Sequence, residues 1–287
     1  MFQNLKMLYK GCDVYVYDNN STDRTSEVAL KNGAIVRKES LQGKGFVVRR
    51  MFSDIDSDII LVDGDNTYDP KAAPEMVRIL LESGADMVTG VRISKDIKSY
   101  RMGHKLGNKA LTSLVSFIFG DHCSDMLSGY RVFSHRFVKS FPSVSQGFEI
   151  ETELTVHALD MHMNIQEIET LYISRDDNSF SKLSTFRNGF RILSTILSLL
   201  KLEKPLLLFS CISLILILVA LLAFVPLVLL PWLETGVITR IPTAILSTGL
   251  VIVAVSFFSI GIILESITRA RMEVKRLSYN RYKSPTP

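Results

Sequence analysis

The stretch Ile59-Ile-Leu-Val-Asp-Gly-Asp-Asn-Thr-Tyr-Asp69 decides the fold. An apolar, β-branched run stops at two carboxylates one residue apart, Asp63 and Asp65. A buried strand that ends in such a loop places acidic groups at the carboxyl edge of a sheet, where open α/β sheets bind ligands. Paired carboxylate oxygens there suit a Mg²⁺ or Mn²⁺ ion that also holds phosphates. A solvated turn is the alternative interpretation.

Strands and helices alternate on both sides of this stretch. The residue patterns predict strands at 13–17, 34–37, 58–62, 86–89 and 165–172, and helices at 22–32, 45–53, 74–83, 108–119 and 149–160. In the first helix we expect Asn20 or Ser21 as the N-cap and Gly33 as the closing residue. This βαβ alternation predicts an α/β fold with a mostly parallel sheet and helices on both faces.

The composition changes after Lys204. Residues 206–230 and 241–264 contain no charged side chain, and each stretch is longer than the about 20 residues that cross a bilayer as a helix. We therefore expect two transmembrane helices. Residues 185–202 repeat apolar side chains at helical spacing with basic residues among them. This favours an amphipathic helix in the headgroup plane over a helix packed on the soluble core.

The basic residues gather beside the two apolar stretches. The formal net charge is +4, and Lys201 and Lys204 precede the first stretch. The basic residues after the second stretch are Arg269, Arg271, Lys275, Arg276, Arg281 and Lys283. The positive-inside rule places both flanks, and the domain before Pro205, in the cytoplasm of a multi-pass membrane protein. The three cysteines show no pairing or metal spacing, which agrees with a reducing cytosol.

Further polar segments could carry chemistry. Asp18-Asn-Asn-Ser-Thr-Asp23 follows a strand, and its residues could bind a ribose or phosphate or could form a turn and helix cap. Lys44 lies in a Gly-Lys-Gly turn and could reach a base or phosphate. Asp125-Met-Leu-Ser-Gly-Tyr-Arg131 sets a carboxylate and a guanidinium around a glycine. Arg175 and Lys182 bracket a polar loop, where they could hold a phosphate or extend to lipid headgroups.

Together these segments resemble one family. Asp-Asn-Asn-Ser-Thr-Asp at 18, Gly-Lys-Gly at 43, Asp-Gly-Asp at 63, Gly-Val-Arg at 90, Asp-x-x-Ser-Gly-Tyr-Arg at 125 and Ser-Lys-Leu at 181 follow in matching order. They are similar to the family 2 glycosyltransferases of the polyprenyl-phosphate type, which include the dolichyl-phosphate mannose and glucose synthases. Two membrane helices after the catalytic domain also fit this family.

The resemblance implies a GT-A-like fold and the transfer of a hexose from a UDP- or GDP-sugar to a polyprenyl phosphate. By position, it implies that Asp18, Lys44, Asp63 and Arg92 bind the donor, with Asp63 and Asp65 also holding Mg²⁺ or Mn²⁺. Asp65, Asp125 and Arg131 would be catalytic, and Arg175 and Lys182 would bind the acceptor phosphate. Membrane lipid is then a partner and nucleic acid is not, while a homo-oligomer is compatible with the sequence.

The expected organisation is a catalytic domain at 1–184, an interfacial helix at 185–204, two membrane helices within 205–267 and a basic cytoplasmic tail at 268–287. Two features depart from the family pattern. Asn19 stands where the family usually has a second acid, and the first strand of the donor pocket is missing, so we expect an N-terminally truncated domain. Two alternatives remain open. One is a haloacid-dehalogenase-like phosphatase with Asp63 as its nucleophile, and the other is a non-catalytic, decayed transferase that acts as a binding protein.

Overall fold

The computed structural model describes residues 12–93, 123–143, 146–147, 149–173, 194, 197–198 and 200–285. The chain forms two compact units. The first consists of Met1–Ile192 together with Val274–Pro287, and the second is Leu193–Glu273. The predicted helix at 108–119 and most of the predicted interfacial helix at 185–202 lie outside the described residues.

The described strands of the first unit form a parallel pair and a four-stranded sheet. In the pair, β1 (Tyr15–Asp18) lies beside β2 (Ile35–Lys38). The larger sheet has the order β3-β5-β4-β6, with β3 at Ile59–Leu61, β4 at Met87–Ile93, β5 at Arg131–Phe133 and β6 at Ile165–Leu171. β4 and β6 are parallel, whereas β5 is antiparallel to both of its neighbours.

The α/β prediction is confirmed, with one difference: the larger sheet is mixed because of β5. This strand has three residues, too few for an alternating pattern to be read from the sequence. The helices of the first unit are α2 (Thr25–Lys31), α3 (Lys44–Asp54), α4 (Ala73–Ser83), α6 (His135–Ser140) and α7 (Ile150–Asp160), with a short 3₁₀ turn at Pro70–Ala72 before α4. α6 was also not predicted, because six residues make less than two helical turns.

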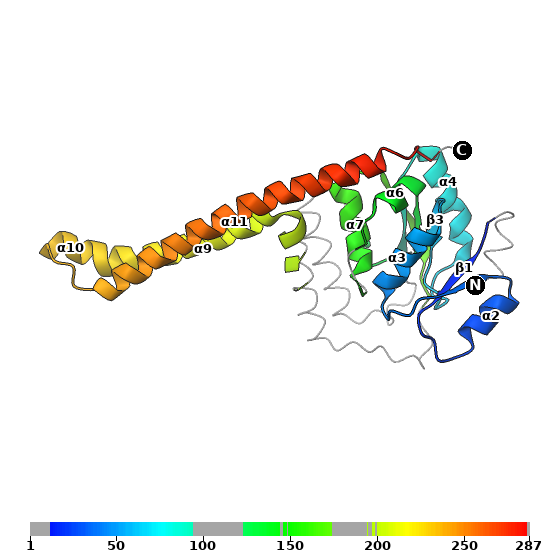
Figure 1. The fold of residues 1–287 in the computed structure, drawn as a ribbon, viewed down its shortest axis with the longest axis horizontal. Coiled ribbons are helices and arrows are strands. Elements are labelled where there is room, and N and C mark those ends of the chain that lie inside the picture. Colours follow the sequence, from blue (N-terminus) through cyan, green and yellow to red (C-terminus); the bar gives the residue numbers. More distant parts are fainter. Residues whose placement is uncertain are drawn as a thin grey trace. The chain divides into compact units, whose positions relative to one another are not determined.

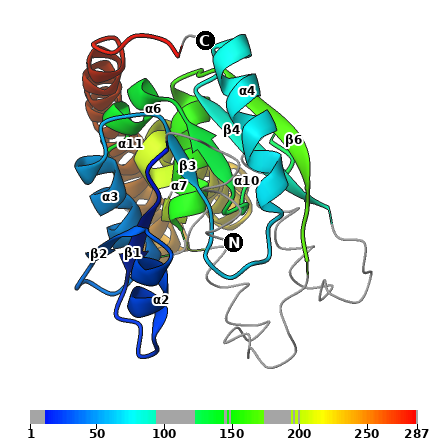
Figure 2. The same cartoon turned by 90° about the vertical axis from the view of Figure 1, so that its right-hand side faces the viewer.

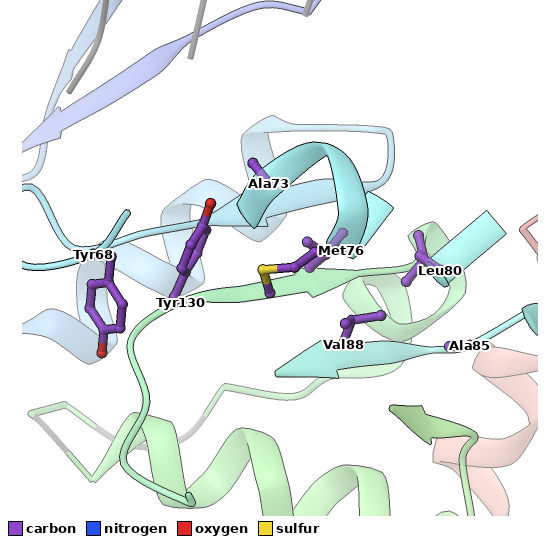
Figure 3. Packing of buried hydrophobic residues seen from close by; sticks show 8 residues of the cluster. Tyr68, Ala73, Met76, Leu80, Ala85, Val88 and Tyr130 are labelled. Atoms are coloured by element: carbon purple, nitrogen blue, oxygen red, sulfur yellow. The ribbon is translucent and has the colours of Figure 1, made fainter. Parts of the chain in front are cut away.

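Helices cover the two faces of the four-stranded sheet. α4 lies on one face, while α3, α6 and α7 lie on the other (Figures 1 and 2). Successive side chains of a strand point to opposite faces. Val132 and Tyr130 accordingly pack with Met76 and Leu80 of α4. Figure 3 shows the side chains of Tyr130, Met76 and Leu80 in this cluster. Apolar burial therefore holds α4 against β4 and β5.

Aromatic side chains fill the opposite face. Phe133 of β5 lies 5.6 Å from Phe52 of α3 and 4.7 Å from Phe137 of α6, measured between ring centroids. Burying each such ring contributes about 1.5–3 kcal/mol. His157 of α7 packs edge-on against Phe137, and burial lowers its pKa to about 3. His157 is thus a neutral histidine of the core.

The predicted cap of the first helix was wrong in part. α2 begins at Thr25, and its N-cap position is Arg24, which makes no capping hydrogen bond with its side chain. Asp23 Oδ1 instead accepts from the Thr25 amide at 3.0 Å. Asn20 and Ser21 belong to the preceding turn. Gly33 closes the helix as expected, with φ +76° and its amide donating to Leu30 O at 2.9 Å.

The C-terminal segment is part of the first unit. Tyr279 Oη donates to Asp86 Oδ2 at 2.8 Å, and the Arg136 guanidinium lies 4.7 Å from the centroid of the Tyr279 ring. Asp86 is 1% exposed, and Arg136 also binds both of its carboxylate oxygens. Ser278 Oγ adds a hydrogen bond to Lys139 O at 3.0 Å. The buried charge of Asp86 is therefore compensated by groups from two distant parts of the chain.

The second unit is a pair of long apolar helices. α9 (Pro205–Phe224) continues through a π-helical segment at Val225–Leu229 into α10 (Leu230–Thr235), and α11 spans Ile241–Tyr279. Pro226 lies in the π-helical segment, where its missing N–H is tolerated. Phe209 of α9 stacks on Phe257 of α11 at 5.9 Å. By length and composition, Pro205–Thr235 and Ile241–Tyr279 could each cross a membrane, as predicted.

The Asp86–Tyr279 bond leads to a prediction about stability. Tyr279→Phe should lower the free energy of unfolding by about 1–2 kcal/mol, because a hydrogen bond to a buried carboxylate is lost while the ring stays over Arg136. Thermal unfolding of the full-length protein in detergent, followed by circular dichroism, measures this. Tyr282→Phe is the matched control, since the Tyr282 hydroxyl makes no hydrogen bond within the described part of the chain. Equal midpoints for the two variants would contradict the role of this bond.

Candidate active site

The end of β3 and the beginning of β5 lie at the same edge of the four-stranded sheet. Because β5 runs antiparallel, its first residue, Arg131, pairs with Leu61 at the end of β3 and with Thr89 in β4. The loop before β5 therefore reaches the edge at which the loop after β3 leaves the sheet. This geometry brings the predicted site residues of the 63–65 and 125–131 motifs to one place.

Lys44 lies between two carboxylates that come from distant parts of the chain. Its Nζ donates to Asp63 Oδ1 and to Glu151 Oε1, each at 2.6 Å. Burial by itself lowers the pKa of Lys44, but the charges of Glu151 and Asp63 outweigh burial and raise the pKa. Lys44 is therefore a permanent cation. Two predicted donor-binding residues, Lys44 and Asp63, are in direct contact.

Glu151 is a site residue that the sequence did not single out. It lies in the first turn of α7, and the residue is 7% exposed. Burial raises its pKa, and the charge of Lys44 offsets part of that rise. Its Oε2 is buried and has no hydrogen-bond partner among the described residues. Acids stand at 149, 151 and 153, and no feature of this pattern shows which of them is buried beside a lysine.

Backbone contacts fix the turn that carries Lys44. The Gly43 amide donates to Asn19 Oδ1 at 2.8 Å, and the Gly45 amide donates to Gln146 O at 3.1 Å. Gly43 has φ +147°, and a Cβ at this position would collide with the Gln146 carbonyl oxygen. Glycine is thus required here both by backbone conformation and by space. The position of Lys44 is set by the residues just before α7 as well as by its own ion pairs.

Asn19, the departure from the family's adjacent acids, joins two loops. Its Nδ2 donates to Glu39 O at 3.0 Å and to Leu41 O at 2.7 Å, while its Oδ1 accepts from Gly43. A carboxylate cannot donate to a carbonyl. The amide therefore makes contacts in this chain that a second acid could not make.

Asp18 is engaged within its own loop. Oδ1 accepts from the Ser21 amide at 3.0 Å, and Oδ2 accepts from Ser26 Oγ at 2.6 Å. Hydrogen bonds from Ser21 and then from Ser26 hold the pKa of Asp18 below its ordinary value. These contacts agree with the turn interpretation of the loop, and donor binding by Asp18 stays a prediction.

Asp63 lies against the loop before β5. A Cβ at Gly129 would fall 2.6 Å from Asp63 Cγ and closer still to its Oδ2. The Gly129 amide donates to Tyr68 Oη at 2.8 Å, and the Tyr68 ring packs 5.4 Å from that of Tyr130. Tyr68 is a second residue that the sequence did not single out. It belongs to the core between α4 and the sheet, so the hydrophobic core sets the position of Gly129.

Asp125 and Arg92 form a bidentate ion pair. Arg92 Nε and a terminal nitrogen donate to the two carboxylate oxygens at 2.6 and 2.7 Å. Burial raises the pKa of Asp125, but the hydrogen bonds and charge of Arg92 outweigh burial, so the pKa lies below its ordinary value. The Arg92 guanidinium also lies 5.5 Å from the centroid of the Tyr172 ring. The structure thus joins one predicted catalytic residue to one predicted donor-binding residue.

Arg131 is fully buried. Its guanidinium donates to Ser128 O at 3.0 Å, to Met126 O at 2.6 Å and to Thr155 Oγ1 of α7 at 2.8 Å. Burial lowers its pKa. These contacts hold the loop that carries Asp125 and Gly129. They support a positioning role, and direct participation of Arg131 in catalysis stays a prediction.

Asp63 and Asp65 supply oxygen donors of the kind that Mg²⁺ and Mn²⁺ prefer. The Asp63 side chain is 33% exposed. Asp65 Oδ1 accepts from Thr67 Oγ1 at 2.6 Å and from the Thr67 amide at 3.2 Å, which shapes a turn with Asn66 at φ +59°. No group of three His, Cys, Asp or Glu gathers for a metal within the described residues. One or two carboxylates with phosphate oxygens and water are enough for Mg²⁺, so the residues fit the predicted metal in that form.

The predicted acceptor-phosphate residues Arg175 and Lys182 lie outside the described residues. β6, the last strand in the described part of the chain, ends at Leu171, before both residues. Their assignment to the acceptor stays a prediction.

Comparison with known proteins identifies the family. The model of the family described as "Glycosyl transferase family 2" matches residues 2–141 of this chain. Glycosyltransferase AglJ of Haloferax volcanii is 34% identical over 205 residues, which cover 70% of this chain and 67% of that protein. The chain belongs to glycosyltransferase family 2. It is therefore a glycosyltransferase, and the phosphatase alternative has no support from this match.

Other relatives agree with this family. The dolichyl-phosphate hexose transferase of Haloferax volcanii is 29% identical over 175 residues, covering 61% of this chain and 75% of that protein. The crystal structure of Mycobacterium tuberculosis glucosyl-3-phosphoglycerate synthase superimposes with a TM-score of 0.56 at 20% identity, covering 69% of this chain and 73% of that chain. This likeness shows a GT-A-like fold. The same synthase has also been crystallised with Mn²⁺ and UDP.

The contact between Gly129 and Asp63 predicts a large effect of a small substitution. Gly129→Ala should lower the free energy of unfolding by about 1–3 kcal/mol, because the new methyl group forces the Asp63 carboxylate away from Lys44. The midpoint of thermal unfolding of the full-length protein reports this loss. Gly64→Ala is the matched control, since a Cβ there meets no atom within 4 Å. An unchanged midpoint for Gly129→Ala would contradict this expectation, because the Asp63 loop could then move aside without a loss of unfolding free energy.

The amide of Asn19 predicts a second effect. Asn19→Asp should destabilise the first unit by about 1–3 kcal/mol, because the carbonyls of Glu39 and Leu41 lose their donor and face a negative charge. Thermal unfolding of the full-length variant tests this expectation. Asn280→Asp at the exposed end of α11 applies the same chemical change as a control. A midpoint for Asn19→Asp equal to that of the control would contradict the proposed link between the two loops.

Proposed function

We propose that this protein transfers a hexose from a UDP- or GDP-sugar to a polyprenyl phosphate in a membrane. One observation carries the proposal. A family 2 glycosyltransferase domain is followed in the same chain by two helices that are long and apolar enough to cross a bilayer. Helices that hold the enzyme in the bilayer would keep its catalytic domain beside an acceptor that is also anchored there. The relative named dolichyl-phosphate hexose transferase supports the same class of acceptor.

The proposed orientation is cytoplasmic. Lys201 and Lys204 precede the first apolar helix, and the chain after Leu264 is rich in basic residues, whereas the loop at 236–240 carries Arg240 alone. The positive-inside rule then puts both flanks of a multi-pass protein on the cytoplasmic side. Nucleotide sugars would reach the domain from that side. The basic flanks would contact anionic lipid headgroups.

Asp63 and Asp65 are the proposed ligands of Mg²⁺ or Mn²⁺. A divalent metal supplies Lewis-acid stabilisation of the leaving diphosphate when it is bound. Lys44 lies beside Asp63 and would contribute a fixed positive charge to the same phosphates. The Arg92–Asp125 pair fixes the position of the Asp125 carboxylate at the sheet edge, near which the sugar would lie.

The acceptor phosphate is already an anion near pH 7, so the proposed reaction needs little base catalysis. The residues must chiefly hold the phosphate oxygen in line with the anomeric carbon. We assign this holding to Arg175 and Lys182. Attack from the face opposite the leaving diphosphate gives inversion at the anomeric carbon.

Sugar transfer to lipid tests this function directly. Membranes that contain the full-length protein, incubated with radiolabelled UDP- or GDP-hexoses, Mn²⁺ and polyprenyl phosphate, should yield label that is extractable into organic solvent. Asp65→Ala should lower this label at least about 100-fold, on the scale of other groups that stabilise developing charge. Asp56→Ala removes an exposed carboxylate that lies ahead of β3, at the other end of that strand, and serves as the control.

Two results would overturn the proposal. Label that appears only in a water-soluble product would exclude a lipid acceptor. Transfer by Asp65→Ala at the level of Asp56→Ala would exclude the proposed role of Asp65.

A further inference from the structure

Two carboxylates share Lys44, and they differ in how firmly they are held. The Asp63 side chain is 33% exposed and lies in the loop after β3, whereas the Glu151 side chain is 9% exposed and lies in helix α7. Both are 2.6 Å from the same nitrogen. An exposed carboxylate on a loop can exchange its partner at lower cost than a buried carboxylate on a helix can.

The backbone reinforces the link between Lys44 and Glu151. Gly45 donates to Gln146 O at 3.1 Å, and Gly43 packs against the same carbonyl. The turn that carries Lys44 is therefore attached to the chain just before α7, independently of the ion pair. Among the described residues, no backbone hydrogen bond joins the Lys44 turn to the Asp63 loop.

Lys44 competes with the proposed metal. In the structure Asp63 Oδ1 accepts a hydrogen bond from the ammonium group, so a divalent cation that binds this oxygen would compete with Lys44 for it and would repel the ammonium charge. An ammonium has three donors. Glu151 Oε2, which is buried without a partner in the described part of the chain, offers the displaced group a second acceptor on the residue that already holds it.

We propose that Glu151 is a positioning residue that retains Lys44 when Asp63 is given up to the metal, so that Lys44 passes from Asp63 to the diphosphate of the nucleotide. This inference rests on the proposed function for the identity of the ligand. Glu151 acts by holding Lys44 and does not itself contact the sugar. Asp63 is thus the exchangeable partner of Lys44, and Glu151 is the permanent one.

Binding of a nucleotide with Mn²⁺ tests this role without any lipid acceptor. Isothermal titration calorimetry of the full-length protein in detergent would use UDP, and GDP in parallel, each with Mn²⁺. Glu151→Gln should weaken Mn²⁺-dependent binding about tenfold, because Asp63 is then the one charged partner left to Lys44 in the described part of the chain and Lys44 resists displacement. Glu169→Gln removes an exposed carboxylate on β6 and should leave the affinity unchanged.

A double-mutant cycle separates positioning from general structure. Lys44→Met should weaken binding, and adding Glu151→Gln to it should change the affinity less than about twofold, because Glu151 has no lysine left to hold. Glu151→Asp keeps the charge but shortens the side chain, and should give an intermediate affinity. It also provides the answer if Glu151→Gln does not fold.

Several outcomes would overturn the proposal. The first is wild-type nucleotide affinity in a folded Glu151→Gln variant or in Glu151→Asp. The second is an equal loss of affinity when Glu151→Gln is added to the wild-type protein and to Lys44→Met. The third is wild-type protein that binds neither UDP nor GDP with Mn²⁺. A different failure would concern the proposed function alone. If the nucleotide affinities behave as expected but no lipid-linked sugar forms, the assigned acceptor is wrong and the role of Glu151 stands.

Discussion

The ion pairs of Lys44 hold the candidate site together. One ammonium joins the loop after β3 to the first turn of α7, two segments that the sheet and the core position independently. Removing either carboxylate would leave the largely buried ammonium of Lys44 with one of these two partners, so that part of its charge compensation would be lost. Both ion pairs require the turn at Gly43–Gly45 to hold Lys44 between the two carboxylates. Hydrogen bonds from this turn to Asn19 Oδ1 and to Gln146 O keep it in that position.

The short antiparallel strand β5 is the second constraint. A parallel strand would begin at the far edge of the sheet, and the loop before it would open away from Asp63. The reversed direction of β5 brings Gly129 so close to Asp63 that no side chain fits between them. Buried Arg131 then secures the loop through backbone carbonyls and Thr155. The direction of the three-residue strand β5 thus determines that the 63–65 and 125–131 motifs lie together.

Much of this arrangement could be predicted from the sequence. The continuous apolar run before Asp63 and the helical periodicity of α4 are strong signals, and both elements were found near the expected bounds. β5 was missed because its three residues begin with a charged arginine and do not form an apolar run like that of β3, and α6 was missed because six residues are too few for a helical period. Glu151 and Tyr68 were missed for another reason. Their roles depend on burial and on contacts between distant segments, which one sequence does not reveal. The cap of α2 failed because Asp18 takes the Ser21 amide, so the turn continues and the helix begins at Thr25.

The charges at the sheet edge bear on how a nucleotide could enter. Asp63, Asp65 and Glu151 contribute three carboxylates, Lys44 and the buried Arg131 contribute two cations, and Arg92 is already neutralised by Asp125. This part of the described chain is therefore negative before any ligand arrives. A nucleoside diphosphate without a cation would be repelled from it, since like charges at short range oppose binding. A divalent ion bound there would remove that repulsion. In the proposed function the carboxylates would thus favour a nucleotide that arrives with its metal, and the exchange of Lys44 from Asp63 to phosphate would follow from the same charges.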